Sequence, residues 1–473
     1  MTTLGCKVNQ YEAAAIRQTL RQAGWTDSDG TQPVAMCVVH SCCVTSTAAQ
    51  KSRQLIRRLA AAHPGAAIVV TGCYATAEPD TLRHIAGVTV IAGHRDNVTE
   101  QLVRLAGSLR RANPPAGPAN ATGGDNSAAN AGPVASSAPS IRAFSSQNVK
   151  VFRAGTTANL APLQRFDDHH RAFVKVQDGC DGFCAYCIVP HLRDRLDSRP
   201  RQAILDEIRR LTAVGHREIV LCGVNLGAYG RPTVHRDRWD DDADRLAALV
   251  DEAAHAAGDA RVRLSSLGPL DVTDELLAVM ARHDNVCPYL HLSLQSGSTA
   301  VLARMNRRYT AAQYLEAVGR LRAALDRPSI TTDVIVGFPG ETDDDFAATL
   351  EVARQAGFAR IHSFPFSPRK GTAAARWDAD RPSRQVVRRR CGQLAALEAE
   401  LARAHLASFV GQTVRVLLEG LREGGGATGL TDRYCRLDLP DAPDDALGCL
   451  VRAEITAVTD TGLLGRLVPA ALA

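Results

Sequence analysis

Apolar and polar positions alternate with two different periods along the first 110 residues. Asn9 and Glu12 are spaced as in a helix capping box, Ile16 and Leu20 fall on one helical face, and Gly24 ends the pattern. Short apolar runs typical of buried strands follow, with helical stretches between them, at residues 34–39, 68–71 and 88–92. Strands that alternate with helices predict a doubly wound parallel sheet, which we assign to residues 1–110.

Strand-like runs resume near residue 171, and each gap between them is long enough for a helix. Six such runs lie at residues 173–176, 218–222, 261–267, 289–295, 330–338 and 361–366. Six βα units predict an α/β core with an open, partial (β/α)6 barrel over residues 165–400. Shorter runs separated by Gly-rich turns lie at residues 414–418, 434–437, 451–455 and 463–468. They predict a small β-barrel over residues 409–473.

The stretch between these regions differs in composition. Residues 113–139 are almost entirely Ala, Gly, Pro, Asn and Ser, so we interpret residues 111–150 as a disordered linker. The 473 residues as a whole are 45% hydrophobic and 22% charged, which is ordinary for a globular protein. No run of about 18 apolar residues and no secretory signal is visible, so we expect no membrane partner and a cytoplasmic location.

Three cysteines stand immediately after the first predicted barrel strand, at the end where the active sites of such barrels lie. Cys180, Cys184 and Cys187 form the pattern CxxxCxxC. Three thiolates in so short a loop can hold three irons of a [4Fe–4S] cluster and leave the fourth iron open, as S-adenosylmethionine (SAM) needs for its reductive cleavage. The alternative is a structural zinc loop, with His191 as the fourth ligand. The spacing after a barrel strand favours the cluster.

A second set of cysteines is spread over the N-terminal region. Cys6, Cys42 and Cys73 each follow a predicted strand. Parallel strands end on the same edge of a sheet, so these thiols can converge there. Convergence of three thiols would again fit a cluster with one open iron. The alternative interpretation is three buried structural thiols, which are common in protein cores.

The cysteines and their surroundings resemble the methylthiotransferase family of radical SAM enzymes along nearly the whole chain except the linker. The family has the same order of an N-terminal cluster domain, a radical SAM core and a C-terminal TRAM domain. Residues 3–12, Thr-Leu-Gly-Cys-Lys-Val-Asn-Gln-Tyr-Glu, resemble the bacterial branch that acts on threonylcarbamoyladenosine in tRNA. The alternatives are the branches that methylthiolate isopentenyladenosine in tRNA or a ribosomal protein.

This resemblance implies two [4Fe–4S] clusters and SAM as cofactors. Cys180, Cys184 and Cys187 would bind the cluster that cleaves SAM to a 5′-deoxyadenosyl radical, which removes hydrogen from C2 of the modified adenine beside the anticodon. A second SAM would methylate a sulfur on the open iron of the auxiliary cluster before its transfer to C2. The resemblance assigns that auxiliary cluster to Cys6, Cys42 and Cys73.

Polar residues at the ends of predicted barrel strands are candidates to bind SAM. They are Ser265, Ser266, Gln295 and Asp333. Their side chains would hydrogen-bond the ribose or the amino-acid part of SAM, and capping of the strand ends is the alternative role. Gly268 stands where relatives tend to have Glu, which removes a possible cofactor contact. His40 replaces the usual Asn two residues before Cys42, where it would either tune the cluster or face solvent.

The resemblance implies tRNA and a flavodoxin- or ferredoxin-like electron donor as partners, and it leaves the sulfur donor unknown. Charge alone does not predict RNA binding, because the net charge is only +5 and residues 409–473 hold six arginines against nine acidic residues. A local RNA contact is predicted through Arg433 and Tyr434. A second basic candidate, or else a solvated helix face, comprises Arg381, Arg384, Arg388, Arg389 and Arg390. The alternative from another class is a non-catalytic, zinc-bearing RNA-binding protein.

Overall fold

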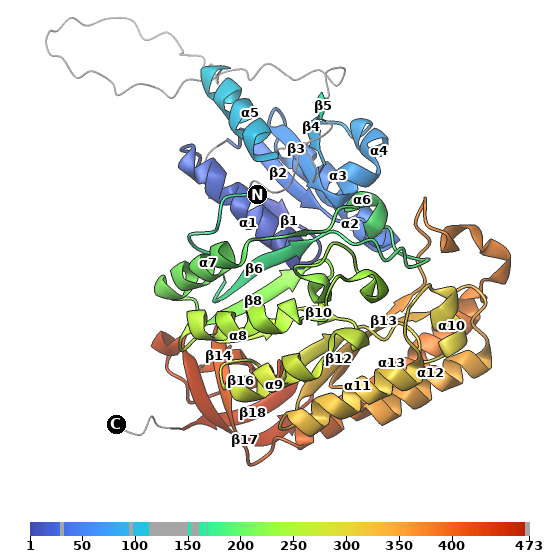
Figure 1. Cartoon of the computed structure of the whole chain (residues 1–473). Coiled ribbons are helices and arrows are strands. Elements are labelled where there is room, and N and C mark those ends of the chain that lie inside the picture. The colour runs from blue at the N-terminus through green and yellow to red at the C-terminus, as the bar shows by residue number, and fades with distance from the viewer. Residues whose placement is uncertain (29–32, 94–97, 113–149, 153–159, 168, 469–473) are drawn as a thin grey trace, which may run out of the picture. The chain divides into compact units, whose positions relative to one another are not determined.

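The computed structural model describes residues 1–28, 33–93, 98–112, 150–152, 160–167 and 169–468. The chain divides into two compact units (Figure 1), unit 1 within residues 1–43 and 47–161 and unit 2 within residues 44–46 and 162–473. The predicted linker at 111–150 lies almost wholly outside the described residues. Within the described ranges, none of the helices combines the length and apolarity needed to cross a lipid bilayer.

Unit 1 is built on a parallel sheet whose strands lie side by side in chain order. The strands are β1 (Thr2–Thr3), β2 (Met36–Ser41), β3 (Ala67–Gly72), β4 (Val88–Ala92) and β5 (Lys150–Phe152). The helices are α1 (Lys7–Gln22), α2 (Ser46–Ala62), α3 (Cys73–Ala77), α4 (Pro79–Arg83) and α5 (Val98–Ala112). The three predicted strands become β2, β3 and β4, and β5 adds a parallel strand that begins at the last residue of the predicted linker.

Helices cover both faces of this sheet. Alternate strand residues such as Val38 and Val69 pack in one cluster with Ile16 of α1. On the opposite face, Ile68 of β3 and Ala60 of α2 both lie next to Gly87: a methyl group on Gly87 would be 3.8 Å from the Ile68 side chain and 2.9 Å from that of Ala60. Strands that are buried on both faces read as continuous apolar runs, which is why the sequence pattern identified them. The predicted doubly wound α/β architecture is confirmed.

Unit 2 contains the six predicted barrel strands, which appear as two adjoining parallel sheets with a short antiparallel edge strand, β7 (Asp197–Ser198). The main strands are β6 (Arg171–Asp178), β8 (Glu218–Gly223), β9 (Arg261–Leu264), β10 (Ser266–Leu267), β11 (Tyr289–Leu292), β12 (Ser329–Val336) and β13 (Arg360–Pro365). The predicted strand at 261–267 is interrupted at Ser265. Its first half, β9, pairs with β8, and its second half, β10, pairs with β11.

Helices lie between these strands, and one further helix follows β13. They are α6 (Val189–Leu192), α7 (Arg201–Ala213), α8 (Arg245–Ala257), α9 (Asp274–Arg282), α10 (Thr299–Arg304), α11 (Ala311–Ala324), α12 (Asp343–Ala356) and α13 (Arg384–Ala407). Their starts follow local sequence rules: Thr310 and Thr342 form capping boxes at α11 and α12. The alternation of strand and helix agrees with the predicted partial (β/α)6 barrel.

The end of unit 2 is a closed β-barrel with the strand order β14-β15-β16-β18-β17. Its strands are β14 (Thr413–Leu421), β15 (Ala427–Thr431), β16 (Arg436–Leu439), β17 (Leu450–Thr459) and β18 (Gly462–Leu467). Four of the five correspond to predicted strands. The sequence ATGLT of β15 was not predicted as a strand because Ala and Gly have low β-propensity.

Buried arginines join this β-barrel to the strands of the partial barrel. Arg261 Nη1 and Nη2 donate to the carbonyl oxygens of Arg415 and Leu430, both at 3.1 Å. Arg263 donates in the same way to the carbonyl oxygens of Asp432 and Thr431, at 2.9 and 3.1 Å. These bonds satisfy backbone acceptors that the packed interface would otherwise leave without water or a partner.

The residues predicted to contact RNA locally take part in the same interface. The ring of Tyr434 lies 5.0 Å from the ring of Tyr289 and 4.9 Å from the Arg263 guanidinium. Arg433 donates to the carbonyl oxygen of Asp326 at 3.1 Å. Both side chains therefore make contacts within the chain, while Tyr434 keeps 36% of its surface exposed, and the predicted RNA contact stays a prediction.

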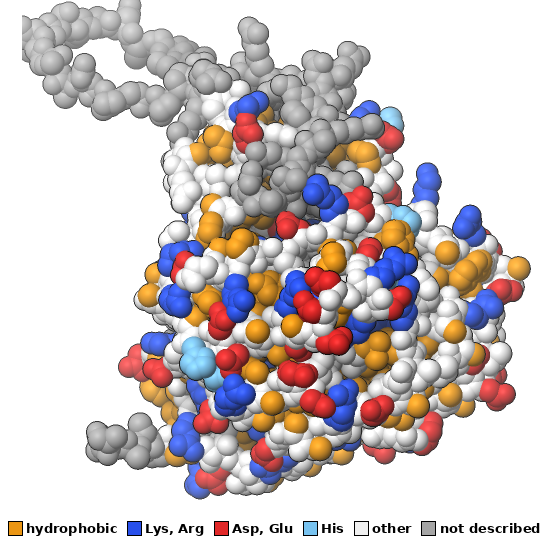
Figure 2. All heavy atoms as spheres, viewed as in Figure 1, with side chains coloured by type: hydrophobic (Ala, Val, Ile, Leu, Met, Phe, Trp, Pro, Cys, Tyr) orange, Lys and Arg blue, Asp and Glu red, His pale blue; other side chains and the backbone are white. Residues whose placement is uncertain are grey.

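Of the five predicted basic residues around the start of α13, Arg384, Arg388 and Arg389 are exposed, and three of the five pair with acidic residues of the chain. Arg390 is buried and pairs with Glu341 at 2.6 Å, and Arg389 pairs with Asp343 at 3.0 Å. Figure 2 shows basic and acidic side chains interspersed over the described part of the face that it draws. Charge on this face therefore gives no continuous phosphate-binding stripe.

Candidate active site

The CxxxCxxC loop, residues 180–187, begins just after β6, and the residues at its start are held by close backbone contacts and ion pairs. Gly179 has φ +79°, and a methyl group there would lie 1.8 Å from the carbonyl oxygen of Arg195, so only glycine fits. The next amide, that of Cys180, donates to the carbonyl oxygen of Arg193 at 2.9 Å. The carboxylate of Asp178 is buried and pairs with Lys175 and Arg193 at 2.5 and 2.8 Å. These contacts hold the loop at the carboxyl end of the parallel strands.

Donors surround the sulfur atoms of this loop. The amide of Gly182 donates to Cys180 Sγ at 3.4 Å, and Arg307 Nη1 donates to Cys184 Sγ at 3.6 Å. Burial raises the pKa of the Cys180 thiol and raises that of Cys187 to about 12. Because a bound metal deprotonates its thiol ligands, the protein supplies donors where thiolate charge would develop on coordination.

The spacing of the thiols tests the zinc alternative. Sulfur ligands of one tetrahedral zinc ion lie about 3.8 Å apart. In the part of the chain that the structure describes, the only three potential ligand atoms within 4.8 Å of one another belong to Asp251, His255 and His283. His191, the suggested fourth ligand, is exposed and lies edge-on to Phe183 with ring centroids 5.5 Å apart. In the structure His191 thus contacts Phe183 and is not placed as a fourth ligand beside the three cysteines.

A cavity of about 300 Å³ lies beside Cys180 and Cys184. Besides these two cysteines, residues of three other segments form most of its wall: Asn225, Gly227, Ala228, Val234, His235, Arg236, Asp237, Trp239, Gly268, Pro269, Leu270, Asp271, Asn306, Arg307, Arg308 and Tyr309. Most of these residues belong to loops at the carboxyl ends of strands, where barrels carry their active sites. The cavity, with its two cysteines, is our candidate active site.

The β8–α8 loop, residues 224–244, is clamped onto the cysteine loop. Thr233 Oγ1 and the amide of Val234 donate to the carboxylate of Asp181 at 2.5 and 2.8 Å. Trp239 lies between two guanidinium groups, 4.2 Å from that of Arg231 and 4.5 Å from that of Arg236. No role was predicted for this loop, although its length and its run of charged residues around Trp239 are visible in the sequence.

Charged side chains at the cavity wall are held in pairs. Arg236 pairs with Asp271 at 3.1 Å, and Arg308 pairs with Asp237 at 3.2 Å. Arg307 is packed against the ring of Tyr309 with its guanidinium 4.9 Å from the ring centre. The wall thus combines arginines, two of them paired with aspartates, with an aromatic surface on which a planar ligand could stack.

The four predicted SAM-binding residues occupy other positions at the strand ends. Ser265 is buried and its Oγ has no hydrogen-bond partner among the described residues, whereas Ser266 is exposed. Gln295 has φ +67°, which is uncommon for a residue other than glycine. Its backbone N–H donates to the carbonyl oxygen of Asp333 at 2.8 Å. Asp333 Oδ2 lies 3.3 Å from His291 Nε2. The structure brings Gln295 and Asp333 together, but none of the four lines the cavity.

In unit 1, the second set of cysteines lies at the carboxyl edge of the sheet. Cys6 precedes α1, Cys42 follows β2, and Cys73 begins α3 directly after β3. Neighbouring residues show how close the loops are: a methyl group on Gly5 would lie 3.2 Å from Cys42 Sγ, and one on Gly72 would lie 2.6 Å from the carbonyl oxygen of Ser41. The strand register therefore places all three cysteines at one edge.

Two polar residues fasten these loops. Asn9 Nδ2 donates to the carbonyl oxygens of Leu4 and Ser41 at 2.9 and 3.2 Å, and so joins the first loop to the second. His40 is buried, with its Nε2 3.2 Å from Glu12 Oε2. The alternative that His40 faces solvent is wrong, because the side chain is enclosed between β2 and α1.

Known proteins share both regions. The Radical SAM superfamily matches residues 174–353, and the uncharacterized protein family UPF0004 matches residues 1–93. The threonylcarbamoyladenosine tRNA methylthiotransferase MtaB of Chlamydia pneumoniae is 33% identical over 469 residues, covering 99% of this chain and 97% of the relative. The tRNA-2-methylthio-N(6)-dimethylallyladenosine synthase of Frankia casuarinae is 36% identical, covering 90% and 72%.

Among solved structures, the radical SAM methyltransferase TsrM of Kitasatospora setae has a similar fold, with a TM-score of 0.50 at 13% sequence identity over 76% of this chain and 73% of TsrM. This likeness supports the α/β fold and no more. The near full-length relatives and the matched radical SAM region settle the enzyme class, and the non-catalytic zinc alternative is excluded. The chain belongs to the methylthiotransferase family of radical SAM enzymes and is a tRNA methylthiotransferase that uses SAM and a [4Fe–4S] cluster.

Proposed function

We propose that this enzyme adds a methylthio group to C2 of N6-threonylcarbamoyladenosine next to the anticodon of tRNA. The observation that carries the choice of substrate is the arginine-rich wall of the cavity, formed by Arg236, Arg307 and Arg308. A threonylcarbamoyl group bears a carboxylate and a hydroxyl, which guanidinium groups recognise. An isopentenyl group bears only hydrocarbon and offers no acceptor to those guanidinium groups, two of which already pair with Asp271 and Asp237. Relatives that are named for this activity support the choice.

We assign the cluster that works with SAM to Cys180, Cys184 and Cys187. When bound there, the cluster and SAM supply the electron and the radical that the reaction needs. The chain itself contributes the donors from Gly182 and Arg307 to the cysteine sulfurs. The β8–α8 loop is held against the same cysteines and narrows access for water.

Four polar residues near the ends of the barrel strands are our candidates to bind SAM. Ser265 Oγ is a buried group that lacks a partner among the described residues, and a hydroxyl of this kind is available to a polar ligand. Gln295 and Asp333 are joined by a backbone hydrogen bond at the ends of neighbouring strands. We propose that these three, with the exposed Ser266, bind the ribose and amino-acid parts of SAM.

We further propose that a second [4Fe–4S] cluster is bound by Cys6, Cys42 and Cys73. The support is their common position at the carboxyl edge of the unit 1 sheet, and Asn9, whose side chain ties two of the three loops together. A flavodoxin- or ferredoxin-like protein is the proposed electron donor, because a low-potential cluster needs a protein of this class to reduce it.

The test is mass spectrometry of nucleosides from bulk tRNA of a deletion strain and of the same strain carrying plasmid-borne variants. We expect 2-methylthio-threonylcarbamoyladenosine to vanish on deletion, to return with the wild-type gene, and to stay absent with Cys184→Ala. Arg308→Gln should lower its level at least about tenfold, since one charge-assisted contact contributes roughly 1.5–3 kcal/mol. The matched control is Arg209→Gln, an exposed arginine of α7 paired with Asp206, which should restore wild-type levels.

The identity to the Frankia casuarinae synthase makes the dimethylallyl nucleoside the second candidate. If the methylthio form of that nucleoside disappears in the deletion strain while the threonylcarbamoyl form persists, the substrate assignment is wrong. If Arg308→Gln behaves like Arg209→Gln, the carboxylate is not recognised by the arginine wall.

A further inference from the structure

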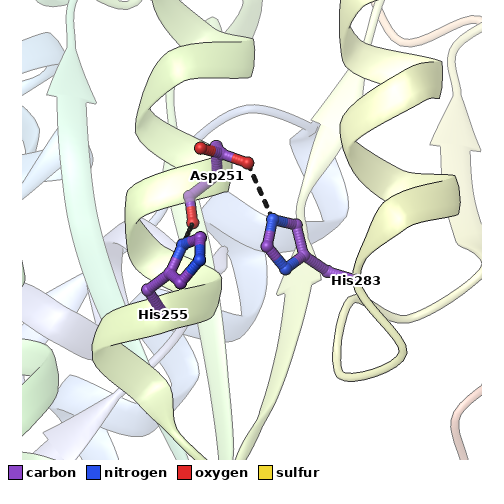
Figure 3. Close-up of side chains that lie close together, drawn as sticks. All are labelled: Asp251, His255 and His283. Atoms are coloured by element: carbon purple, nitrogen blue, oxygen red, sulfur yellow. Dashed lines mark hydrogen bonds and ion pairs between the residues drawn. The ribbon is translucent and has the colours of Figure 1, made fainter.

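Three potential metal ligands meet on the surface of unit 2, in a position that the methylthiotransferase reaction does not use (Figure 3). Asp251 and His255 lie one turn apart on α8, so both project from the same helix face. His283 directly follows the last residue of α9. One ligand atom from each residue lies within 4.8 Å of the other two.

The contacts between these residues prepare them for a cation. His255 Nδ1 lies 2.8 Å from the carbonyl oxygen of Asp251, a hydrogen bond that keeps the proton on Nδ1 and leaves Nε2 free as a ligand. Metal-binding histidines usually donate their other ring nitrogen in this way. His283 Nε2 lies 2.7 Å from Asp251 Oδ1, so an ion bound by both atoms would take the place of the proton that they share.

The backbone that carries His283 is fixed to α8. Asn285 Nδ2 donates to the carbonyl oxygens of Ala254 and Gly258 at 2.8 and 2.9 Å. These bonds fasten the segment after α9 to the end of α8, so the separation of His283 from Asp251 does not depend on a flexible loop. A ligand set held by its scaffold binds an ion with less loss of conformational entropy.

The site is open to ions from solvent. His255 is exposed, and the side chains of Asp251 and His283 keep 31% and 13% of their accessible surface. Arg282 Nη1 also lies 3.0 Å from Asp251 Oδ1, but its side chain is 62% exposed and can turn into water when an ion takes its place. No described residue of this set lines the active-site cavity.

We propose that Asp251, His255 and His283 form a binding site for a divalent transition-metal ion of the zinc type, which joins α8 to the end of α9. Two imidazoles and one carboxylate are the donor set that zinc accepts, with water completing a tetrahedron. Ligand atoms around such an ion lie about 3.3 Å apart, so the His255 ring closes on the ion by rotation about its side-chain bonds. The proposal is independent of the substrate assigned above.

The experiment uses the full-length enzyme, anaerobically reconstituted with iron and sulfide, and titrates it calorimetrically with Zn²⁺. Wild type is compared with His255→Ala and His283→Ala, and with His84→Ala, which removes an exposed histidine of unit 1. All four proteins keep every cysteine, so zinc binding by thiols is common to them. We expect wild type and His84→Ala to bind one more zinc ion than the two site variants, or to bind it at least about tenfold more tightly.

Thermal unfolding supplies a second readout. His255 is exposed, so His255→Ala should have the same unfolding midpoint as wild type when no zinc is added. Zinc should raise the midpoint of wild type and His84→Ala but not that of the site variants, because an ion that binds only the folded state stabilises it. Equal stoichiometry, equal affinity and equal midpoint shifts in all four proteins would overturn the proposal.

Discussion

Glu218 holds the two arginines that join the partial barrel of unit 2 to its C-terminal β-barrel. It begins β8, is fully buried, and lies 2.5 Å from Arg261 and 2.8 Å from Arg263. The same two arginines donate to carbonyl oxygens of the C-terminal β-barrel. The substitution Glu218→Gln keeps the shape of the side chain but removes its charge. It therefore leaves two buried guanidinium groups facing an amide, one end of which is itself a donor.

The expected loss can be worked out from the acid–base equilibrium of Glu218. Burial alone would raise its pKa, but Arg263 and Arg261 lower it from 4.5 to about 2. That difference corresponds to about 3.4 kcal/mol of preference for the ionised form in the folded state. Breaking a buried ion pair from one side costs about 3–5 kcal/mol, in the same range. Against a typical total of about 5–15 kcal/mol, this is a large fraction of the stability of unit 2.

Urea denaturation of the reconstituted protein measures this loss. In a Trp25→Phe background, fluorescence from Trp239 and Trp377 reports on unit 2 alone. The matched control is Glu454→Gln, which breaks a surface pair with Arg466 whose side chains are 35% and 66% exposed, and which should cost less than about 1 kcal/mol. A cost for Glu218→Gln as small as that of the control would refute the reasoning.

Three further predictions follow from the same structure. Because the pKa of Glu218 is lower in the folded state, the stabilisation from its charge is complete above about pH 4.5 and is lost as the pH falls toward 2. The midpoint of acid unfolding should therefore differ between Glu218→Gln and wild type, and an unchanged profile would contradict this. Gly72→Ala places a methyl group 2.6 Å from the carbonyl oxygen of Ser41, at a residue with φ +88°. We expect the free energy of unfolding to fall by about 1–3 kcal/mol and metal analysis to show loss of iron from unit 1. Full iron content would argue against the close packing of these strand ends. Arg307→Gln removes a cation beside Cys184 Sγ, so the reduction potential of the adjacent cluster should fall. A redox titration followed by electron paramagnetic resonance measures this potential, and an unchanged value would show that the cation does not act on the cluster.

Much of the fold could be predicted because its signals are local. Runs such as Ile68–Val70 are apolar at every position, since both faces of the strand are buried, and capping residues such as Thr342 stand beside the helices that they start. The cysteines of the CxxxCxxC loop were visible for the same reason, because a short loop needs all its ligands close together in sequence. By contrast, β15 has little apolar surface, so its place was set by its partners β14 and β16 and not by its own residues.

The residue sequence was therefore sufficient for most of the strands and helices, the two sets of cysteines and the enzyme family. The folded chain was needed to show that Arg433 and Tyr434 face the partial barrel, that His40 pairs with Glu12, and that Trp239 stands in the wall of the active-site cavity. These features depend on contacts between residues that are far apart in the chain. Periodicity and spacing report on neighbours within a turn or a strand, whereas burial and charge pairing at a distance depend on how whole elements pack.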